Sequence, residues 1–166
     1  MIKNLTTAAS LPTQTEDWLR LDQQLCFALY ASSLAMTKLY KPLLEPLSLT
    51  YPQYLVMLVL WEADAISVST LGQRLSLDSG TLTPLLKRLE AAGQINRCRA
   101  SDDERRVDIF LSPKGRALKT QALHIPSHVA CTSACSLEDL ASLTHRLHEL
   151  RKQLSNTAPF VSPTHP

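Results

Sequence analysis

Residues 67–115 read SVSTLGQRLSLDSGTLTPLLKRLEAAGQINRCRASDDERRVDIFLSPKG, and this stretch decides the fold. Its spacing predicts a short helix over Val68–Leu75, a tight turn, and a second helix over Ser79–Ala92. A charged hairpin follows, in which a strand from Gln94 leads to a polar tip and a return strand over Val107–Leu111. Two helices across a turn and then a β-ribbon predict a winged helix-turn-helix, whose second helix enters the major groove of DNA.

The second helix divides its residues between two faces. Its leucines recur at helical spacing and are predicted to pack inward, and Asp78 or Ser79 can cap its N-terminus. On the other face small hydroxyl side chains come first and cations later, an order that suits base edges and then phosphates. The residues of this helix that we expect to face DNA are Ser79, Thr81, Thr83, Lys87 and Arg88.

The hairpin tip carries Arg105 and Arg106 at the end of a thin ribbon. An arginine in that position can enter a minor groove, although an isolated charged hairpin is more often a solvated turn. The helix-turn-helix before it favours the DNA-contacting interpretation. Over residues 87–116 eight Lys and Arg face five Asp and Glu, so positive charge is in excess where the DNA-reading elements lie.

Length and composition predict one domain per protomer. The chain has 166 residues and a net charge of only +2, which by itself does not argue for nucleic acid. No apolar run approaches the roughly 20 residues of a membrane span, and the polar N-terminus lacks an export signal, so we expect a cytoplasmic protein without a membrane partner. The expected regions are a flexible N-terminus (1–15), dimerisation helices (16–50 and 113–154), the DNA-binding domain (51–112) and a proline-rich disordered tail (155–166).

Helices are predicted on both sides of the DNA-reading elements. They retain apolar stripes, which favour a symmetric homodimer whose two recognition helices bind the half-sites of a palindromic operator. The expected segments are Asp17 to about Lys41, a short piece over Leu43–Leu47, an apolar helix over Gln53–Glu62, a helix from Ser112 towards Cys131 with a bend near Pro126, and a last helix that Ser136 caps and that ends near Leu154.

The stretch resembles the MarR family of bacterial repressors. That family carries an Asp-x-Arg pattern in the wing, then alternating apolar residues and a Leu-Ser pair, and Asp103, Arg105, Val107, Ile109, Leu111 and Ser112 fit it. Residues 77–90, LDSGTLTPLLKRLE, resemble the organic-hydroperoxide-resistance regulators within the family, and the likeness spans about residues 17–150. It implies a mainly α-helical winged helix-turn-helix dimer with a small β-wing, binding double-stranded DNA through the residues named above together with Asp103.

Cys26 lies on an apolar helix, where a lone cysteine is usually a small buried hydrophobe. Tyr30 is one turn away on the same face, and Tyr40 lies fourteen residues further along than Cys26, a distance of about 21 Å on a helix. A contact between Cys26 and Tyr40 would therefore need a second chain packed antiparallel, or a break in the helix. Phenol hydroxyls can donate hydrogen bonds to a thiolate and so favour its charged form.

The resemblance gives these residues roles. It implies that Cys26 is the sensor thiol, held by two tyrosines of the partner subunit, and that Tyr40 and Tyr51 occupy those positions with Tyr30 as a third tyrosine of the pocket. An organic hydroperoxide would oxidise the thiolate to a sulfenic acid, which then condenses with a second thiol.

The resolving thiol is implied by the same resemblance. Cys131 stands at the position that the two-cysteine subclass uses, and Cys135, a turn later, is an open alternative. Cys98, at the base of the wing, matches no role and is predicted to be a packing residue. A disulfide between Cys26 and Cys131 would displace the helix after the wing and release DNA.

Other functions fit the sequence less well. His124, His128, Cys131 and Cys135 lie at offsets of 0, 4, 7 and 11, but one straight helix cannot surround a tetrahedral zinc ion, so no metal or cofactor is expected. Two alternatives stay open: a repressor released by a non-covalent phenolic ligand, with Cys26 inert, and a repressor released by a metal. A thiol enzyme pairing Cys26 with a histidine lacks any glycine-rich phosphate loop or paired-carboxylate motif, so no catalytic turnover is expected.

Overall fold

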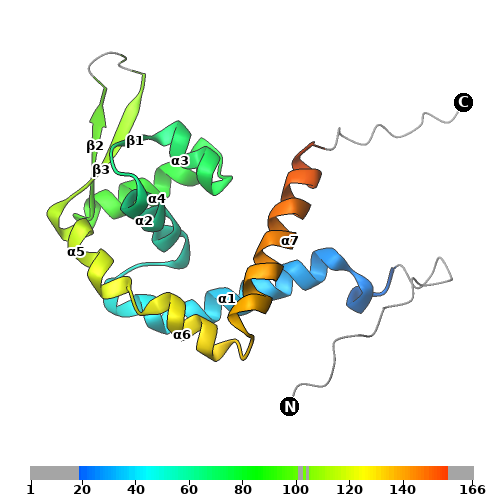
Figure 1. The fold of residues 1–166 in the computed structure, drawn as a ribbon. Coiled ribbons are helices and arrows are strands. Elements are labelled where there is room, and N and C mark those ends of the chain that lie inside the picture. Colours follow the sequence, from blue (N-terminus) through cyan, green and yellow to red (C-terminus); the bar gives the residue numbers. More distant parts are fainter. Residues whose placement is uncertain (1–18, 101–102, 104, 157–166) are drawn as a thin grey trace, which may run out of the picture.

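The computed structural model describes residues 19–100, 103 and 105–156. Figure 1 shows a head formed by α2, α3, α4 and the sheet, which contains the elements predicted to read DNA, with α1 and α6 beneath it and α7 rising to one side. This mainly helical fold with one small sheet confirms the predicted class. The elements are α1 (Leu25–Leu44), α2 (Tyr51–Glu62), β1 (Ile66–Ser67), α3 (Val68–Leu75), α4 (Ser79–Ala91), β2 (Ile95–Arg99), β3 (Val107–Leu111), α5 (Pro113–Ala122), α6 (Ile125–Thr132) and α7 (Leu137–Asn156).

The head follows the sequence prediction closely. Helix α3 and strand β3 have the predicted bounds, and α4 ends one residue early, at Ala91. The sheet is antiparallel in the order β1-β3-β2, with Ile66 opposite Ile109 and Ile95 opposite Leu111. Strand β1 was not predicted, because two residues carry no readable alternation.

The N-terminal helix is shorter than predicted. It begins at Leu25 instead of Asp17, because Gln24 is extended and a 3-10 turn precedes it, although the apolar periodicity continues across this interruption. At its other end α1 continues through Pro42 to Leu44, and a 3-10 turn over Glu45–Leu47 completes the segment predicted as a separate piece. Pro42 lies two residues before the end of α1, so it removes one N–H from the helical hydrogen bonds without ending the helix.

The chain after the wing breaks where a proline requires it. Helix α5 ends at Ala122 and α6 begins at Ile125, so the predicted bend near Pro126 is confirmed and lies just before that residue. In a continuous helix the Pro126 ring would clash with the carbonyl four residues earlier, on Ala122. Helix α7 extends to Asn156, so residues 155 and 156, which were predicted to belong to a disordered tail, are helical, and both 1–15 and 157–166 lie outside the described residues.

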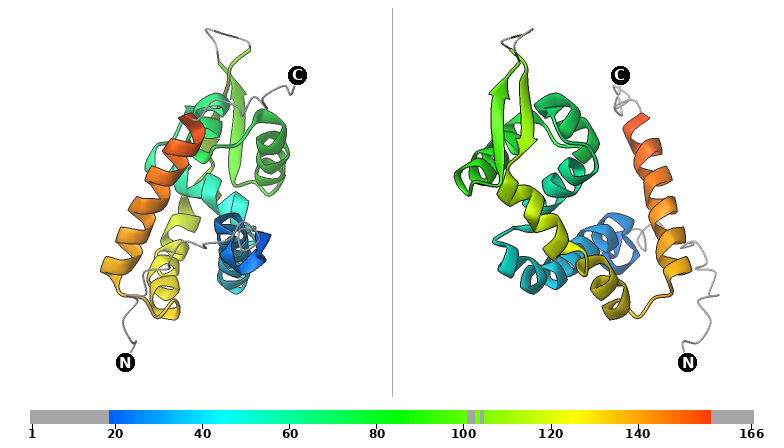
Figure 2. Two further views of the ribbon diagram at one scale, coloured as in Figure 1. Left: turned by 90° about the vertical axis from the view of Figure 1, so that its right-hand side faces the viewer. Right: turned by 60° about the vertical axis from the view of Figure 1, so that its left-hand side comes forward.

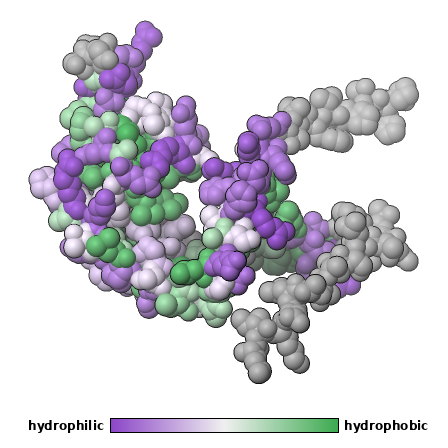
Figure 3. All heavy atoms as spheres, in the orientation of Figure 1, coloured by the Kyte–Doolittle hydropathy of each residue, from purple (hydrophilic) through white to green (hydrophobic). Residues whose placement is uncertain are grey.

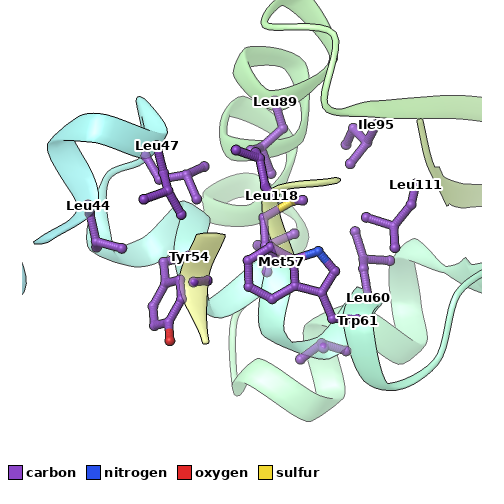
Figure 4. Close-up of a cluster of buried hydrophobic side chains, with 14 of the residues drawn as sticks. Leu44, Leu47, Tyr54, Met57, Leu60, Trp61, Leu89, Ile95, Leu111 and Leu118 are labelled. Carbon is purple, nitrogen blue, oxygen red and sulfur yellow. The ribbon is translucent and has the colours of Figure 1, made fainter. Parts of the chain in front are cut away.

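The core surrounds α2 and combines side chains of the head with others from the end of α1, α5 and α6 (Figure 4). Leu82, Leu86 and Leu89 of α4 are fully buried as predicted, whereas Leu85 is half-buried. Other buried side chains are Leu44, Leu47, Tyr54, Met57, Leu60, Trp61, Ile95, Ile109, Leu111, Leu118 and Ile125.

Helices α1 and α7 expose apolar side chains instead. In Figure 3 green surface lies beside α7 where it crosses α1, while the outer end of the wing is purple. Such faces are typical of helices that pair with a second protomer. No single helix in the described part of the chain is long and apolar enough to span a membrane. The bent pair Leu25–Leu47 with Tyr51–Glu62 reaches that length and apolar composition only when the two helices are taken together. The exposed apolar residues of these two helices are Leu25, Phe27, Leu29, Tyr30, Leu34 and Met36 on α1 and Leu137, Leu143, Leu147 and Leu154 on α7.

Candidate DNA interface and thiol sensor

Asp78 caps the helix that is predicted to read DNA. Its carboxylate accepts the backbone N–H of Thr81 at 2.9 Å and the Thr81 hydroxyl at 2.9 Å. These hydrogen bonds hold the pKa of Asp78 below its usual value, and the one from the Thr81 backbone N–H has the larger effect. The Thr83 hydroxyl likewise donates to the Ser79 carbonyl at 2.6 Å. Both threonine protons are therefore used inside the helix, and their oxygens remain available as acceptors for base donors.

A groove of about 710 Å³ lies between α3, the start of α4 and the wing. It brings together Ser79, Thr83, Arg105 and Arg106 from the predicted set. Arg97 of β2 also lines the groove. The sequence analysis did not predict this residue, although a cation on a strand beside a recognition helix is a pattern that indicates a DNA contact. Thr81, Lys87 and Arg88 are exposed on α4 outside the lining of this groove.

Asp103 accepts hydrogen bonds from the residues that lead into β3. The Asp103 carboxylate accepts the Arg105 N–H at 2.9 Å, and the Asp103 carbonyl accepts the Arg106 N–H at 2.9 Å. The Arg106 guanidinium pairs with Asp108 at 3.2 Å. Asp103 thus shapes the turn that presents Arg105, whose side chain is exposed.

The four cysteines are all exposed in a single chain. Cys26 lies in the first turn of α1, with its Sγ 4.0 Å from the side-chain oxygen of Gln24. Cys98 stands on β2 opposite Asp108, so the prediction that Cys98 packs inside the chain is wrong. Strand alternation explains this exposure. Side chains alternate between the two faces of β2, and Cys98 lies on the face opposite to that of the buried Ile95.

Two of the three predicted pocket tyrosines come together. The rings of Tyr40 and Tyr51 have centroids 4.8 Å apart, and Tyr54 adds a third ring 5.7 Å from Tyr40. Tyr30 lies apart from them on α1 and is 62% exposed. Because α1 is continuous from Cys26 to Tyr40, a break in the helix cannot bring the two together, and only a second chain could.

Burial keeps these phenols protonated. Desolvation raises the pKa of Tyr40 and of Tyr51 above the ordinary value, and the neighbouring Tyr51 raises that of Tyr40 further. The pKa of Tyr54, which the sequence argument did not single out, rises to about 12 through desolvation and the same two neighbours. Neutral phenols at this site can donate hydrogen bonds to an anion brought against them.

Cys131 and Cys135 do not share a helix. Cys131 lies in the last turn of α6, which ends at Thr132, and Ala134 then turns the chain with a φ of 54°. Cys135 therefore lies beyond the helix, where its thiol donates to the Ser133 carbonyl at 3.4 Å, and the prediction of a position one turn later is wrong.

A second break, between α5 and α6, divides the four His and Cys residues at positions 124, 128, 131 and 135. His124 lies between α5 and α6, so it shares no continuous helix with Cys131. Among the described residues, no three His, Cys, Asp or Glu side chains gather in an arrangement that could hold a metal ion.

Comparisons with known proteins agree with this architecture. Residues 38–122 match the family described as "Transcriptional regulator SarA/Rot". The chain is 51% identical over 138 residues to the organic hydroperoxide resistance transcriptional regulator of Bacillus subtilis (strain 168), a match covering 83% of this chain and 94% of the relative. It is 49% identical to the HTH-type transcriptional regulator TtmR of Methylorubrum extorquens (strain PA1), over 86% of this chain and 73% of that one.

Solved structures give the same result. Reduced AbfR bound to DNA superposes with a TM-score of 0.71 at 32% identity, covering 86% of this chain and 100% of that one. AbfR of Staphylococcus epidermidis superposes with a TM-score of 0.70 at 33% identity, over 86% of this chain and 98% of that one. AbfR has also been solved with a disulfide formed, and that structure superposes with a TM-score of 0.57 at 34% identity, over 81% and 95% of the two chains.

Proposed function

This chain belongs to the OhrR-type transcriptional regulators of the MarR family, and we propose that it represses transcription until an organic hydroperoxide oxidises Cys26. The Tyr40–Tyr51 pair carries the proposal, because it offers two protonated donors that the chain's own Cys26 cannot reach. In an antiparallel homodimer each pair would receive the sensor thiolate of the other subunit. The relatives named above, which include a DNA-bound reduced regulator and one with a disulfide, support this assignment.

Two steps account for the chemistry. The Cys26 thiolate attacks the terminal oxygen of R–O–OH, the O–O bond breaks, and the sulfur keeps the hydroxyl as a sulfenic acid while RO⁻ takes a proton and leaves as the alcohol. The Cys131 thiolate of the partner subunit then attacks that sulfur, and the hydroxyl leaves as water when it takes a proton. The peroxide is the oxidant, and the two thiols supply the two electrons.

Release of DNA follows from where Cys131 lies. A disulfide needs Cα atoms within about 7 Å, so closing it pulls on α6. Helix α6 continues from α5, and α5 starts at the end of the wing (Figure 2). Displacement of this segment would change the spacing of the two recognition helices and with it their fit to a palindromic operator.

DNA contacts are proposed for the groove and its surroundings. Ser79, Thr81 and Thr83 would face bases, Lys87 and Arg88 phosphates, and Arg105 with Arg106 the minor groove beside the recognition helix. Asp103 would act by shaping the tip. A repressor of this kind works in the cytoplasm, where thiols are kept reduced until an oxidant arrives.

Thiol variants test the proposal directly. Purified wild type, Cys26→Ser, Cys131→Ser and Cys135→Ser would receive one equivalent of cumene hydroperoxide, and each sample would be run on a non-reducing gel and titrated with operator DNA. We expect a crosslinked dimer and loss of DNA binding in wild type and Cys135→Ser but not in Cys26→Ser or Cys131→Ser. Cys98→Ser is the matched control and should behave as wild type. A crosslink that survives in Cys131→Ser would transfer the resolving role to Cys135.

A non-covalent inducer is the second candidate, and one cavity favours it. About 490 Å³ of space lies beside Tyr51, lined also by Lys38, Lys41 and Thr50. A phenolic ligand there would release DNA from Cys26→Ser as readily as from wild type, which separates the two mechanisms. We propose that the protein does not consume peroxide catalytically. If each chain consumed many equivalents of peroxide in the presence of a thiol reductant, this proposal would be wrong.

A further inference from the structure

Helix α5 is fastened to the DNA-reading head along its length. The Trp61 indole N–H donates to the Gly115 carbonyl at 2.9 Å, and Lys119 donates to the Trp61 carbonyl at 2.8 Å. Lys114 reaches the Ala92 carbonyl at the end of α4, also at 2.8 Å. Figure 2 shows the result from two sides, with α5 running from the wing base along the head to α6.

One carboxylate joins α5 to the wing itself. Asp64 lies in the turn between α2 and β1, and its Oδ1 accepts the backbone N–H of Leu111, the last residue of β3, at 2.8 Å. The same oxygen accepts the N–H of Ala65 at 2.9 Å, which holds Ala65 at a φ of 59°. The other oxygen, Oδ2, pairs with the Arg116 guanidinium of α5 at 2.6 Å.

The surroundings of Asp64 differ from those of a carboxylate in an ordinary surface pair. The Asp64 side chain is only 23% exposed, although that of Arg116 is 60% exposed. A carboxylate that accepts backbone N–H groups as well as a guanidinium makes charge-assisted hydrogen bonds in a fixed geometry. Strand β1 pairs with β3 through two residues only, so the wing base has few other restraints from this side.

We propose that Asp64 is the positioning residue that transmits a displacement of α5 to the wing. The inference rests on the proposed function, because α5 leads into α6 and Cys131. When α6 is pulled, Arg116 moves with α5, Asp64 follows Arg116, and the Leu111 end of β3 follows Asp64. Without the ion pair α5 can shift without moving the wing, and the base of the wing loses one of the contacts that hold it in position.

Three variants separate this link from general destabilisation. Asp64→Asn keeps an oxygen for the Leu111 N–H but removes the ion pair, and Arg116→Ala removes the ion pair from the other side. Lys114→Ala is the matched control, since it removes a cation two residues from Arg116 whose contact goes to α4 instead. The measurements are operator Kd for reduced and peroxide-oxidised protein at one salt concentration, and Tm.

We expect the ratio of oxidised to reduced Kd to fall by about fivefold or more in Asp64→Asn and in Arg116→Ala, the low end of usual coupling between sites. The double variant should fall no further, because both changes remove one interaction. Lys114→Ala should weaken both forms alike and keep the wild-type ratio. A wild-type ratio in the two test variants would overturn the proposal, whatever their Tm.

A second readout does not depend on oxidation. Hydroxyl-radical footprints of reduced Asp64→Asn and Arg116→Ala should lose protection where the wing lies in the minor groove and keep protection under the recognition helix. Uniform loss or full retention at both places would refute the link. Wild type that binds operator equally in both redox states would instead refute the proposed function, and the footprint would still decide the role of Asp64. Arg116→Lys should restore part of the wing protection.

Discussion

Gly115 of α5 lies so close to the backbone carbonyl of Gln94 that a Cβ at this glycine would come within 2.0 Å of the oxygen. The same carbonyl accepts the N–H of Ser112 at 3.1 Å, and the Ser112 hydroxyl caps α5 through the Gly115 N–H at 3.0 Å. Glycine is therefore needed at this position, because only a residue without a side chain lets the start of α5 pack against the backbone of Gln94, just before β2.

Gly115→Ala should push α5 away from the head. Backbone atoms must move to admit the methyl group, and overpacking of this kind typically costs about 1–3 kcal/mol in the free energy of unfolding. Urea denaturation followed by circular dichroism measures the loss. Gly80→Ala is the control, because its Cβ would meet only the Asp78 side chain, at 3.0 Å, and an equal loss there would contradict the explanation.

Tyr40→Phe and Tyr51→Phe should slow oxidation of Cys26 while leaving reduced operator binding intact. Each change removes one phenol donor, and a hydrogen bond to a charged group contributes about 1.5–3 kcal/mol, which corresponds to about tenfold or more in rate. Stopped-flow measurement with cumene hydroperoxide gives the rate constants. Tyr54→Phe serves as the control behind the pair, and unchanged rates in the two test variants would exclude their role as donors.

Arg105→Ala should weaken operator binding and flatten its dependence on salt. If the guanidinium neutralises one phosphate, the slope of log K against log salt falls in magnitude by about 0.9. Fluorescence anisotropy over a series of salt concentrations measures it. Arg146→Ala, which removes an exposed cation from α7, should leave the slope unchanged, and the same slope in Arg105→Ala would rule out a wing contact with DNA.

Asp78 should contribute stability that depends on pH in one direction. Its pKa is lowered in the folded protein, so the contribution is present above the unfolded value of about 3.9 and is lost as the pH falls through the folded pKa. Asp78→Asn, which keeps a capping side chain, should therefore show a flatter Tm profile below about pH 4. Asp78→Ala should lower Tm at neutral pH as well. If Tm depended on pH in the same way in wild type and both variants, the Asp78 cap would make no contribution to stability.

Local sequence was sufficient to predict most of the DNA-reading head, apart from the two-residue strand β1. The bounds of α3 and β3, the Asp78 cap and the break before Pro126 all depend on interactions within a few residues, such as helical spacing, a capping side chain or a proline ring. The resemblance to MarR-type and OhrR-type regulators rests on the same continuous stretch and agrees with the relatives found. The exposure of Cys98 could also have been read from strand alternation.

The tertiary structure alone decided which distant residues meet. The Tyr40–Tyr51 pair joins two helices across a turn, and Asp64 joins Leu111 and Arg116 over separations that no periodicity encodes. The start of α1 depended on one extended residue, Gln24, which an uninterrupted apolar pattern conceals. Sequence thus determined what short-range hydrogen bonding and side-chain spacing dictate, whereas packing decided the contacts, because those depend on how the whole chain shares one core.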